Sequence, residues 1–197
     1  MKAGLDEAGR GCFFGPIYTA IVIIGDNEEE FRKKAIENKI VIRDSKKMTS
    51  LQREKAKEFI KNNVLAYNIQ SQDNDYIDKN GILKSVMRCF NDSIMKLEPK
   101  PSFLCVDGNY FVNEHVEIPF ECIEKGDDKI LEIACASILA KTSRDEFVIN
   151  FCDEHPEYDD KYCLKRNKGY GTIHHRDGLK KYGLSEYHRK SFCKKFL

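Results

Sequence analysis

Four carboxylates stand where short apolar segments of this 197-residue chain end, close to glycines. Asp6 and Glu7 follow the first such segment, Asp107 the second and Asp127 the third. Because ligand sites gather at strand ends along the edge of an α/β sheet, neighbouring strands would bring these acids together. Such a cluster repels itself unless cations neutralise it, and all-oxygen ligands favour Mg²⁺ or Mn²⁺ over zinc. Two ions about 4 Å apart can activate a water and stabilise the leaving oxygen of a phosphodiester. The four acids are therefore the candidate catalytic residues and metal ligands.

The first pair of acids raises a geometric question. Adjacent residues on a regular strand point to opposite faces of the sheet. Asp6 and Glu7 therefore share a metal site only if the first strand ends or bulges there. Gly9 and Gly11 follow directly, and they predict that this strand ends early.

A glycine-flanked arginine, Gly9-Arg10-Gly11, follows the first acids. A turn without Cβ atoms lets the backbone approach a ligand closely, and a guanidinium suits phosphate. The net charge is only +1, but residues 161–197 hold 11 Lys or Arg and two acids, so they carry 11 − 2 = +9 and residues 1–160 carry 1 − 9 = −8. An acidic body with a basic tail suits a polyanion held beside a metal-binding cluster, although a solvated basic helix gives the same pattern.

Composition bounds the class of protein. With 41% apolar residues the chain can bury a core, and its length fits one domain. No window approaches 18 consecutive apolar residues and no signal peptide precedes the first acids, so we expect a cytoplasmic protein without a membrane span. The eight cysteines are expected to be reduced, and the absence of a C-x-x-C pair argues against structural zinc.

The elements that must position these residues alternate between strands and helices. Apolar runs predict strands at 2–6, 17–24, 64–70, 102–106 and 120–124. Helices are expected at 28–38, from a capping box at Thr49 to about 62, at 77–97, and from 128 to about 151. This order predicts an α/β fold with a central mixed sheet flanked by helices. Residues 1–197 would form one domain, with a core at 1–154 and a basic, helical C-terminal part at 155–197.

Several groups of residues, in the same order along the chain, resemble the motifs of type 2 ribonucleases H, the ribonuclease HII family. They are Gly4-Leu5-Asp6-Glu7-Ala8-Gly9-Arg10-Gly11 with Gly15-Pro16; Arg43-Asp44-Ser45-Lys46-Lys47-Met48; Val106-Asp107-Gly108; Lys125-Gly126-Asp127 with 133–141 and Arg144-Asp145; Gly169-Tyr170-Gly171-Thr172 with His175; and His188-Arg189-Lys190-Ser191-Phe192. Arg10 and a start at the first strand favour this family over the related ribonuclease HIII, which usually has a Gly-Thr-Gly turn and an extra N-terminal domain.

The resemblance implies a ribonuclease H-like fold with a small helical C-terminal part. It implies an endoribonuclease that cleaves the RNA strand of RNA–DNA hybrids and incises 5′ of ribonucleotides embedded in duplex DNA, with two divalent ions, leaving 3′-hydroxyl and 5′-phosphate ends. It assigns the four acids to the ions, Gly9-Arg10-Gly11 to the ribose 2′-hydroxyl and neighbouring phosphate, and Tyr170 to the sugar beyond the ribonucleotide. Basic residues that could contact phosphates are Lys46, Lys47, Lys165, Arg166, Lys168, Lys180 and Lys181.

The sequence departs from the family pattern at a few positions. Residues 128–132 stand where the family often places serines, Cys135 replaces a usual alanine, and Gly81 falls near a usual asparagine. These departures concern fine substrate contacts and not the metal site. An oxygen-ligated two-metal mechanism leaves no catalytic or zinc-binding role for His174, His175 or His188.

Two other functions fit the same residues. One is a metal nuclease of the same fold superfamily that acts on DNA, and cleavage of a duplex with one ribonucleotide distinguishes it. The other is a non-catalytic nucleic-acid-binding module, which would gain nothing from clustered acids that repel phosphate. The sequence does not decide the metal used in the cell, the balance between hybrid and single-ribonucleotide substrates, or whether a replication clamp is a partner; a monomer is expected.

Overall fold

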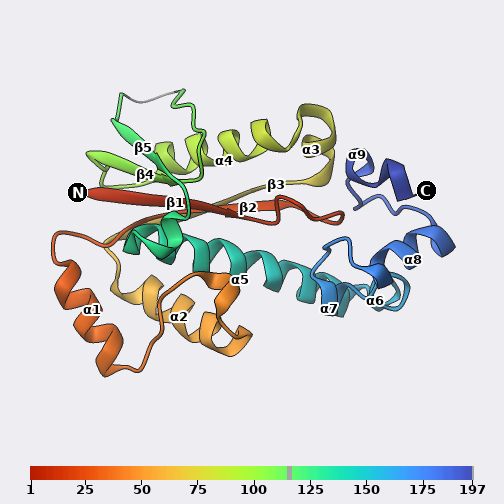
Figure 1. The fold of residues 1–197 in the computed structure, drawn as a ribbon, viewed down its shortest axis with the longest axis horizontal. Helices are drawn as coiled ribbons and strands as arrows, with labels where there is room; N and C mark the ends of the chain where they lie inside the picture. Colours follow the sequence, from red (N-terminus) through yellow and green to blue (C-terminus); the bar gives the residue numbers. More distant parts are fainter. Residues whose placement is uncertain (115–116, 197) are drawn as a thin grey trace.

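The centre of the molecule is a five-stranded mixed sheet with the order β3-β2-β1-β4-β5 (Figure 1). The computed structural model describes residues 1–114 and 117–196. The strands are β1 (Lys2–Ala8), β2 (Ile17–Ile23), β3 (Ala66–Gln72), β4 (Phe103–Asp107) and β5 (Phe120–Ile123). β1, β2 and β3 pair antiparallel, whereas β4 pairs parallel with both β1 and β5. The predicted α/β fold around a mixed sheet is confirmed.

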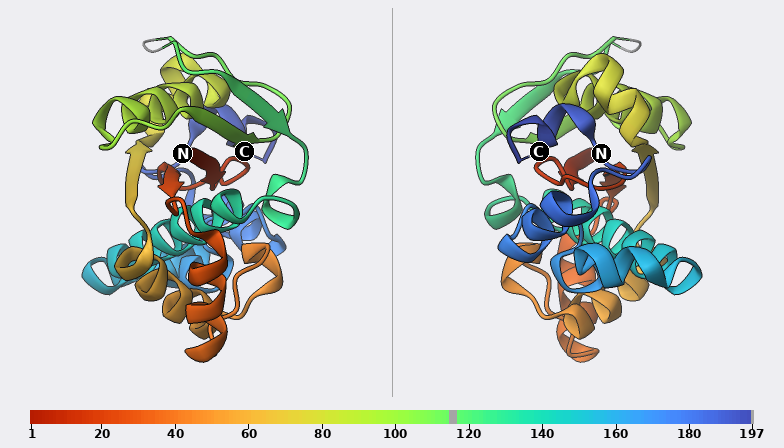
Figure 2. Two further views of the ribbon diagram at one scale, coloured as in Figure 1. Left: turned by 90° about the vertical axis from the view of Figure 1, so that its left-hand side faces the viewer. Right: turned by 90° about the vertical axis from the view of Figure 1, so that its right-hand side faces the viewer.

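Helices cover both faces of this sheet. α3 and α4 lie on one face, and α1, α2 and α5 lie on the other (Figures 1 and 2). Short 3₁₀ turns occur at Ser45–Lys47, Gly126–Asp128 and Lys194–Phe196. The helices are α1 (Glu28–Glu37), α2 (Ser50–Asn63), α3 (Asn74–Asn80), α4 (Ile82–Lys96), α5 (Leu131–Glu154), α6 (Pro156–Tyr162), α7 (Leu164–Asn167), α8 (Ile173–Tyr182) and α9 (Lys190–Cys193).

β2 is almost entirely apolar because it supplies two cores. Ala20 and Val22 belong to the buried cluster that α2 and α5 share. Ile21 and Ile23 belong to the cluster on the opposite face, with α4. Successive side chains of a strand alternate between faces, so a strand covered by helices on both sides reads as one continuous apolar run.

Helix α5 lies unusually close to β1. A Cβ placed on Gly4 would be 2.2 Å from the Glu132 carbonyl carbon and 2.3 Å from the Ile133 nitrogen. Residues 131–140 are all buried, and the run 134–137 has small side chains. Glycine on the strand and small residues on the helix therefore let the two backbones approach each other.

Several predicted boundaries differ from the structure, and three of these differences have a clear structural cause. β1 continues to Ala8 instead of ending at residue 6, because β2 pairs with it as far as Tyr18. The helix predicted at 77–97 is two helices, α3 and α4, separated at Gly81, whose φ of +83° lies in the left-handed region. The long helix begins at 131 and not 128, since residues 126–128 form a 3₁₀ turn that carries Asp127.

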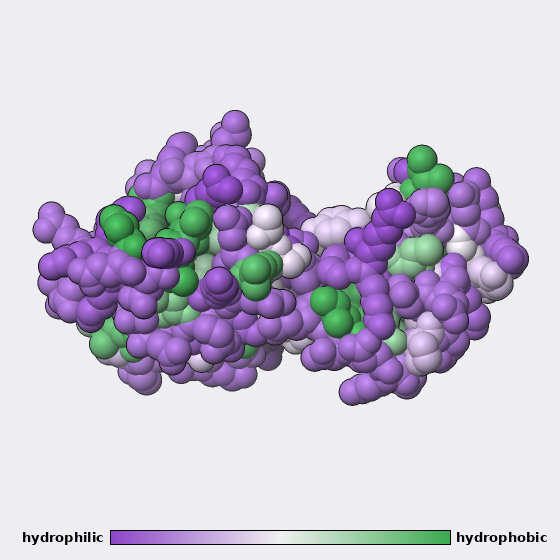
Figure 3. All heavy atoms as spheres, turned by 90° about the horizontal axis from the view of Figure 1, so that it is seen from below, coloured by the Kyte–Doolittle hydropathy of each residue, from purple (hydrophilic) through white to green (hydrophobic). Residues whose placement is uncertain are grey.

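Helices α6 and α7 pack against the second half of α5, α8 packs on α6, and α9 lies beside α3 (Figure 1). A third buried cluster joins them and includes Phe14, Val148, Leu164 and Leu179. Phe14 follows the glycine turn, so this turn is packed into the C-terminal part. Figure 3 shows a mostly hydrophilic surface on the face formed by α1, α2 and α5, with a narrower waist between the two ends of the molecule.

Two general expectations about the chain can be compared with the structure. All eight cysteines are free thiols, and six of them are buried, in keeping with reduced side chains that act as small apolar groups. Within residues 1–114 and 117–196, none of the helices is long and apolar enough to cross a bilayer.

Candidate active site at the ends of β1 and β4

The parallel pairing of β1 and β4 places two acids at one level of the sheet. Leu5 lies beside Val106 in the register, so Asp6 and Asp107 follow at the same end of neighbouring strands. Asp127 comes from the 3₁₀ turn after β5, the next strand along. The Gly126 N–H donates to Asp107 Oδ1 at 2.7 Å, which ties this turn to β4. The structure thus brings Asp6, Asp107 and Asp127 to one edge of the sheet, as we predicted from the positions at which the strands end.

Glu7 joins this edge although its strand does not end early, so that expectation was wrong. Glu7 lies in regular register opposite Thr19. Its N–H donates to Asp6 Oδ1 at 2.7 Å. Asp107 raises the pKa of both Asp6 and Glu7, so its charge acts on both carboxyls even though they are adjacent on one strand.

Burial and mutual repulsion make this edge favourable for cations. Asp6 is only 6% exposed, and its pKa lies well above its usual range because of burial first and then because of Glu7 and Asp107. Burial also raises the pKa of Glu7, against the opposing charge of Arg10. The pKa of Asp127 is raised by burial, Asp44 and Asp107. A divalent ion would relieve this repulsion, and an all-oxygen donor set fits Mg²⁺ or Mn²⁺.

The acid side chains are not yet arranged around a common point. In the described part of the chain, no three His, Cys, Asp or Glu side chains converge as a ready metal site. Arg10 Nη1 lies 3.4 Å from Glu7 Oε1, and Asp107 Oδ1 accepts the Gly126 N–H. Ion binding would therefore require rotation of these carboxylates, which the exposed position of Arg10 allows.

A buried pair of hydroxyls lies beneath Asp6, and sequence reasoning gave it no role. Ser45 Oγ and Ser137 Oγ are 3.0 Å apart and buried. A hydrogen bond from Ser137 lowers the pKa of Asp6, which partly offsets its burial. Both serines fall inside recognised motifs, but only the fold places a residue of α5 and a residue 92 positions earlier together.

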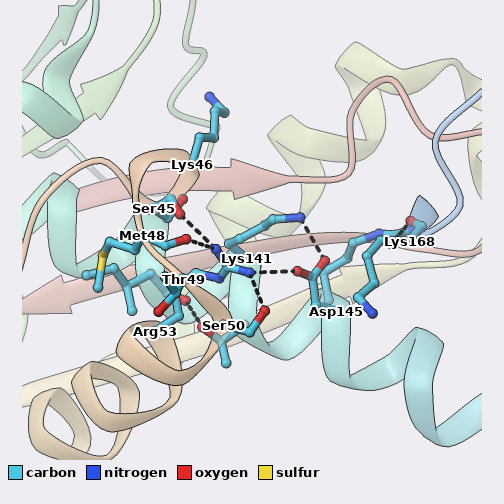
Figure 4. A network of polar contacts seen from close by, with 12 residues as sticks. Ser45, Lys46, Met48, Thr49, Ser50, Arg53, Lys141, Asp145 and Lys168 are labelled. Atoms are coloured by element: carbon cyan, nitrogen blue, oxygen red, sulfur yellow. Dashed lines mark hydrogen bonds and ion pairs between the residues drawn. The ribbon is translucent and has the colours of Figure 1, made fainter. Parts of the chain in front are cut away.

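A polar network holds the Ser45–Lys47 turn against α5 (Figure 4). Arg53 Nη1 donates to the carbonyls of Met48 and Ser45, at 2.6 and 3.1 Å. Its Nη2 lies 3.5 Å from Asp145 Oδ2, and Lys141 Nζ donates to Asp145 Oδ1 at 2.8 Å. The segment that carries Lys46 is therefore fixed relative to the long helix.

The Gly9–Gly11 turn is held from below by two buried arginines. Arg189 Nη1 donates to the Gly9 carbonyl at 2.7 Å and lies 3.2 Å from the Arg10 carbonyl. Arg144 Nη2 donates to the Phe14 carbonyl at 2.8 Å. Both guanidinium groups are fully buried, and neither forms an ion pair within the residues that the structure describes. Their charge makes the turn attractive to a phosphate, and sequence reasoning had not assigned them this position.

Gly9 and Gly11 differ in backbone conformation and in the space around them. Gly9 has φ +93°, and a Cβ there would lie 2.8 Å from Arg144 Nε. A Cβ on Gly11 would meet no heavy atom within 4 Å. The Gly9 carbonyl already accepts from Arg189 and from the Cys12 N–H at 3.2 Å, so both of its lone pairs are occupied. The open, available backbone of the turn is at Gly11.

Tyr170 lies directly beside this turn. Cys12 and Tyr170 form an isolated β-bridge, and the Phe13 N–H donates to the Gly169 carbonyl at 2.8 Å. Tyr170 is 37% exposed, and Lys141 Nζ lies 5.4 Å from the centroid of its ring. The turn and the tyrosine, 160 positions apart, thus share one exposed surface.

The predicted phosphate contacts fall into two groups. Lys46 is exposed and points away from the network in Figure 4, and its charge lowers the pKa of two of the acids. Arg166 is also exposed. Lys47 instead pairs with Asp128 at 2.8 Å, and Lys168 Nζ donates to a carbonyl of α7. Lys165, on α7, pairs with Asp153 at 2.5 Å, whereas Lys180 and Lys181 are exposed on α8.

Comparison with known proteins agrees with this arrangement. The family model described as Ribonuclease HII matches residues 3–195. A protein of Christiangramia forsetii named Ribonuclease HII is 41% identical over 190 residues, covering 96% of this chain and 89% of the relative.

Two solved structures share the fold. The ribonuclease H2 of Pyrococcus horikoshii superposes with a TM-score of 0.80 at 24% identity, covering 99% of this chain and 96% of that one. The RNase HII of Archaeoglobus fulgidus, solved in complex with PCNA, superposes with a TM-score of 0.78 at 24% identity, covering 98% and 94%.

Proposed function

Because this chain belongs to the ribonuclease HII family, we propose that it is an endoribonuclease that cleaves the RNA strand of RNA–DNA hybrids and incises duplex DNA 5′ of an embedded ribonucleotide. The products would carry 3′-hydroxyl and 5′-phosphate ends. The observation that carries the proposal is the placement of a buried acidic edge on the same strand, β1, that leads into the open turn at Gly11. Chemistry on a phosphodiester and inspection of the sugar would thus occur a few residues apart.

The four acids would hold two Mg²⁺ or Mn²⁺ ions. When bound, the ions would activate a water and stabilise the departing 3′-oxygen. Asp6 and Asp107 sit on adjacent parallel strands and would be the central ligands, with Glu7 and Asp127 on either side. The Ser137 hydroxyl would hold Asp6 in place.

Recognition of RNA requires contact with the 2′-hydroxyl. The backbone of Gly11 has open space around it, so a ribose can come within hydrogen-bonding distance of it. Tyr170, bridged to the same turn, would pack against the next sugar. Arg10, Lys46 and exposed cations of the C-terminal part would supply salt-sensitive contacts to phosphates.

A substrate series tests this function. We expect cleavage of a duplex with a single ribonucleotide and of a long RNA–DNA hybrid, no cleavage of all-DNA duplex, and activity with Mg²⁺ or Mn²⁺. Asp127→Asn should abolish cleavage, whereas Asp128→Asn, one position along in the same turn and paired with Lys47, should retain it. Cleavage of all-DNA duplex would instead establish a DNA nuclease, and equal activity of the two variants would remove Asp127 from the site.

We further infer that the protein acts as a monomer in the cytoplasm, where its nucleic-acid substrates lie. The basic C-terminal part, at +9 over residues 161–197, would face the duplex. Gel filtration with and without a substrate duplex tests the monomer.

A further inference from the structure

Two histidines in the C-terminal part are fully buried and lie in direct contact. His175 is on α8 and His188 precedes α9; both are 0% exposed. Their Nε2 atoms are 3.0 Å apart. The proposed metal chemistry uses neither ring, so their placement requires another explanation.

The partners of the two rings fix where every proton lies. The Ser185 N–H and the Ser185 hydroxyl lie 3.0 and 2.7 Å from His188 Nδ1. The N–H can only donate, so this nitrogen carries no proton and accepts from the hydroxyl as well. His188 therefore donates from Nε2 to Nε2 of His175. At the far end, His175 Nδ1 lies 3.0 Å from the Tyr170 carbonyl, which can only accept. The partners at both ends of the chain of hydrogen bonds therefore lead to one assignment, with the proton on Nδ1 of His175 and on Nε2 of His188.

The pair connects the two segments that would recognise the substrate. His175 holds the carbonyl of Tyr170. His188 forms an isolated β-bridge with Phe14, and the next residue, Arg189, holds the Gly9 carbonyl. One side of the pair therefore leads to the tyrosine and the other to the glycine turn.

We infer that His175 and His188 are positioning residues whose Nε2–Nε2 hydrogen bond sets the spacing between Tyr170 and the Gly9–Gly11 turn. The inference rests on the proposed function, because that spacing matters only if the turn and the tyrosine contact successive sugars. It assigns the pair a role in selectivity for a ribonucleotide followed by DNA. In a long hybrid, where each nucleotide of the cleaved strand has a 2′-hydroxyl, the position of Tyr170 discriminates less.

Burial keeps the chain of hydrogen bonds intact at neutral pH. It lowers the pKa of His175 to about 4 and of His188 to about 3. A protonated ring would carry a proton on both nitrogens and would break one of the bonds. An aromatic ring without nitrogens fills the same space but makes none of them, so phenylalanine isolates the hydrogen bonds from the packing.

The tautomers can be read directly in the unmodified protein by ¹⁵N NMR of the imidazole nitrogens. We expect a proton on Nδ1 of His175 and on Nε2 of His188 at pH 7. The opposite tautomer of either ring, or a doubly protonated ring, overturns the inference without any variant.

The variant that tests selectivity is His175→Phe, with His174→Phe as the matched control on the same helix, where the side chain is exposed. A displacement of about 1 Å at a recognition site costs up to roughly a hundredfold in rate. We expect His175→Phe to lose about ten- to a hundredfold in kcat/KM on the single-ribonucleotide duplex and clearly less on the long hybrid, with His174→Phe unchanged. His188→Gln keeps one hydrogen-bond acceptor and one donor, so we expect it to retain more of the preference for the single-ribonucleotide duplex than His175→Phe does. It replaces His175→Phe in the test if that variant does not fold.

The outcomes separate the inference from the function on which it rests. Equal losses on both substrates, or an unchanged preference in His175→Phe, overturn the positioning role and leave the nuclease intact. Failure of the unmodified protein to cut at a single ribonucleotide overturns the proposed function itself, whatever the tautomers are.

Discussion

Alanine at Gly9 and at Gly11, introduced one at a time, separates what the fold requires of the turn from what the substrate requires. At Gly9, φ is +93°, a region that costs an L-residue about 1–2 kcal/mol. The new Cβ would also lie 2.8 Å from Nε of Arg144, whose buried guanidinium is held by the Phe14 carbonyl. Overpacking of this kind adds about 1–3 kcal/mol. The sum of about 2–5 kcal/mol lowers Tm by roughly 4–20 °C, at about 2–4 °C per kcal/mol for a chain of this size.

At Gly11 the same methyl group meets no protein atom within 4 Å. We therefore expect the free energy of unfolding to change by less than about 0.5 kcal/mol. The methyl group would, however, occupy space through which the ribose approaches the backbone. Loss of one hydrogen bond worth about 1–3 kcal/mol lowers kcat/KM by about 5- to 150-fold.

Thermal melting by circular dichroism and cleavage of a single-ribonucleotide duplex measure the two effects on the same samples. The expected pattern is a destabilised Gly9→Ala and a stable but weakly active Gly11→Ala. Wild-type kcat/KM for Gly11→Ala would refute the reasoning about ligand space. A wild-type Tm for Gly9→Ala would refute the reasoning about Arg144.

Further predictions concern charge and protonation. Asp6→Asn should abolish cleavage yet raise Tm in metal-free buffer, because burial and neighbouring acids disfavour the carboxylate; a lower Tm would contradict this. Chelation by EDTA should abolish cleavage and added Mg²⁺ should restore it, which a gel assay follows. Burial lowers the pKa of His175 to about 4 and of His188 to about 3, so below pH 6.5 the unfolded chain binds protons that the folded chain does not. The contribution of the two histidines to the free energy of unfolding is therefore complete above pH 6.5 and falls toward pH 4, by about 3 kcal/mol for His175 alone. Thermal melts across this range should show a steeper dependence of Tm on pH for wild type than for His175→Phe. Lys46→Ala should weaken substrate binding and reduce the salt slope by about one, whereas Lys47→Ala, which loses an ion pair with Asp128, should change it less; equal slopes in titrations at several salt concentrations would refute the distinction.

The acidic edge could be predicted because its geometry follows from local signals. Apolar segments that end in Asp6, Asp107 and Asp127 are visible in the sequence, and parallel pairing then aligns their ends. The length of β1 could not be predicted, because it depends on how far β2 pairs with it. The left-handed φ of Gly81 shows the same limit, since the apolar pattern continues through a backbone break.

The supports of the site depend on contacts between distant segments. Arg189 reaches the Gly9 carbonyl across 180 positions, and Ser45 meets Ser137 across 92. Nothing in the local sequence distinguishes a buried arginine from the exposed cations that surround it in the C-terminal part. The count of +9 for residues 161–197 treated Arg189 like every other cation there, whereas the fold buries Arg189, together with Arg144 of α5, beside the turn.

The close contact of α5 with β1 means that the length of this helix sets the distance between the acidic edge and the loop that carries Tyr170. Its backbone is fixed against Gly4, Ser137 supports the acidic edge, and Arg144 holds the loop that carries Tyr170. Ser137 and Arg144 are seven residues apart, about 10 Å along a helix. One residue inserted or deleted between them would rotate one end by about 100° relative to the other. Changes of length should therefore be tolerated in the loops around α1 but not in this stretch, in natural relatives and in engineered variants alike.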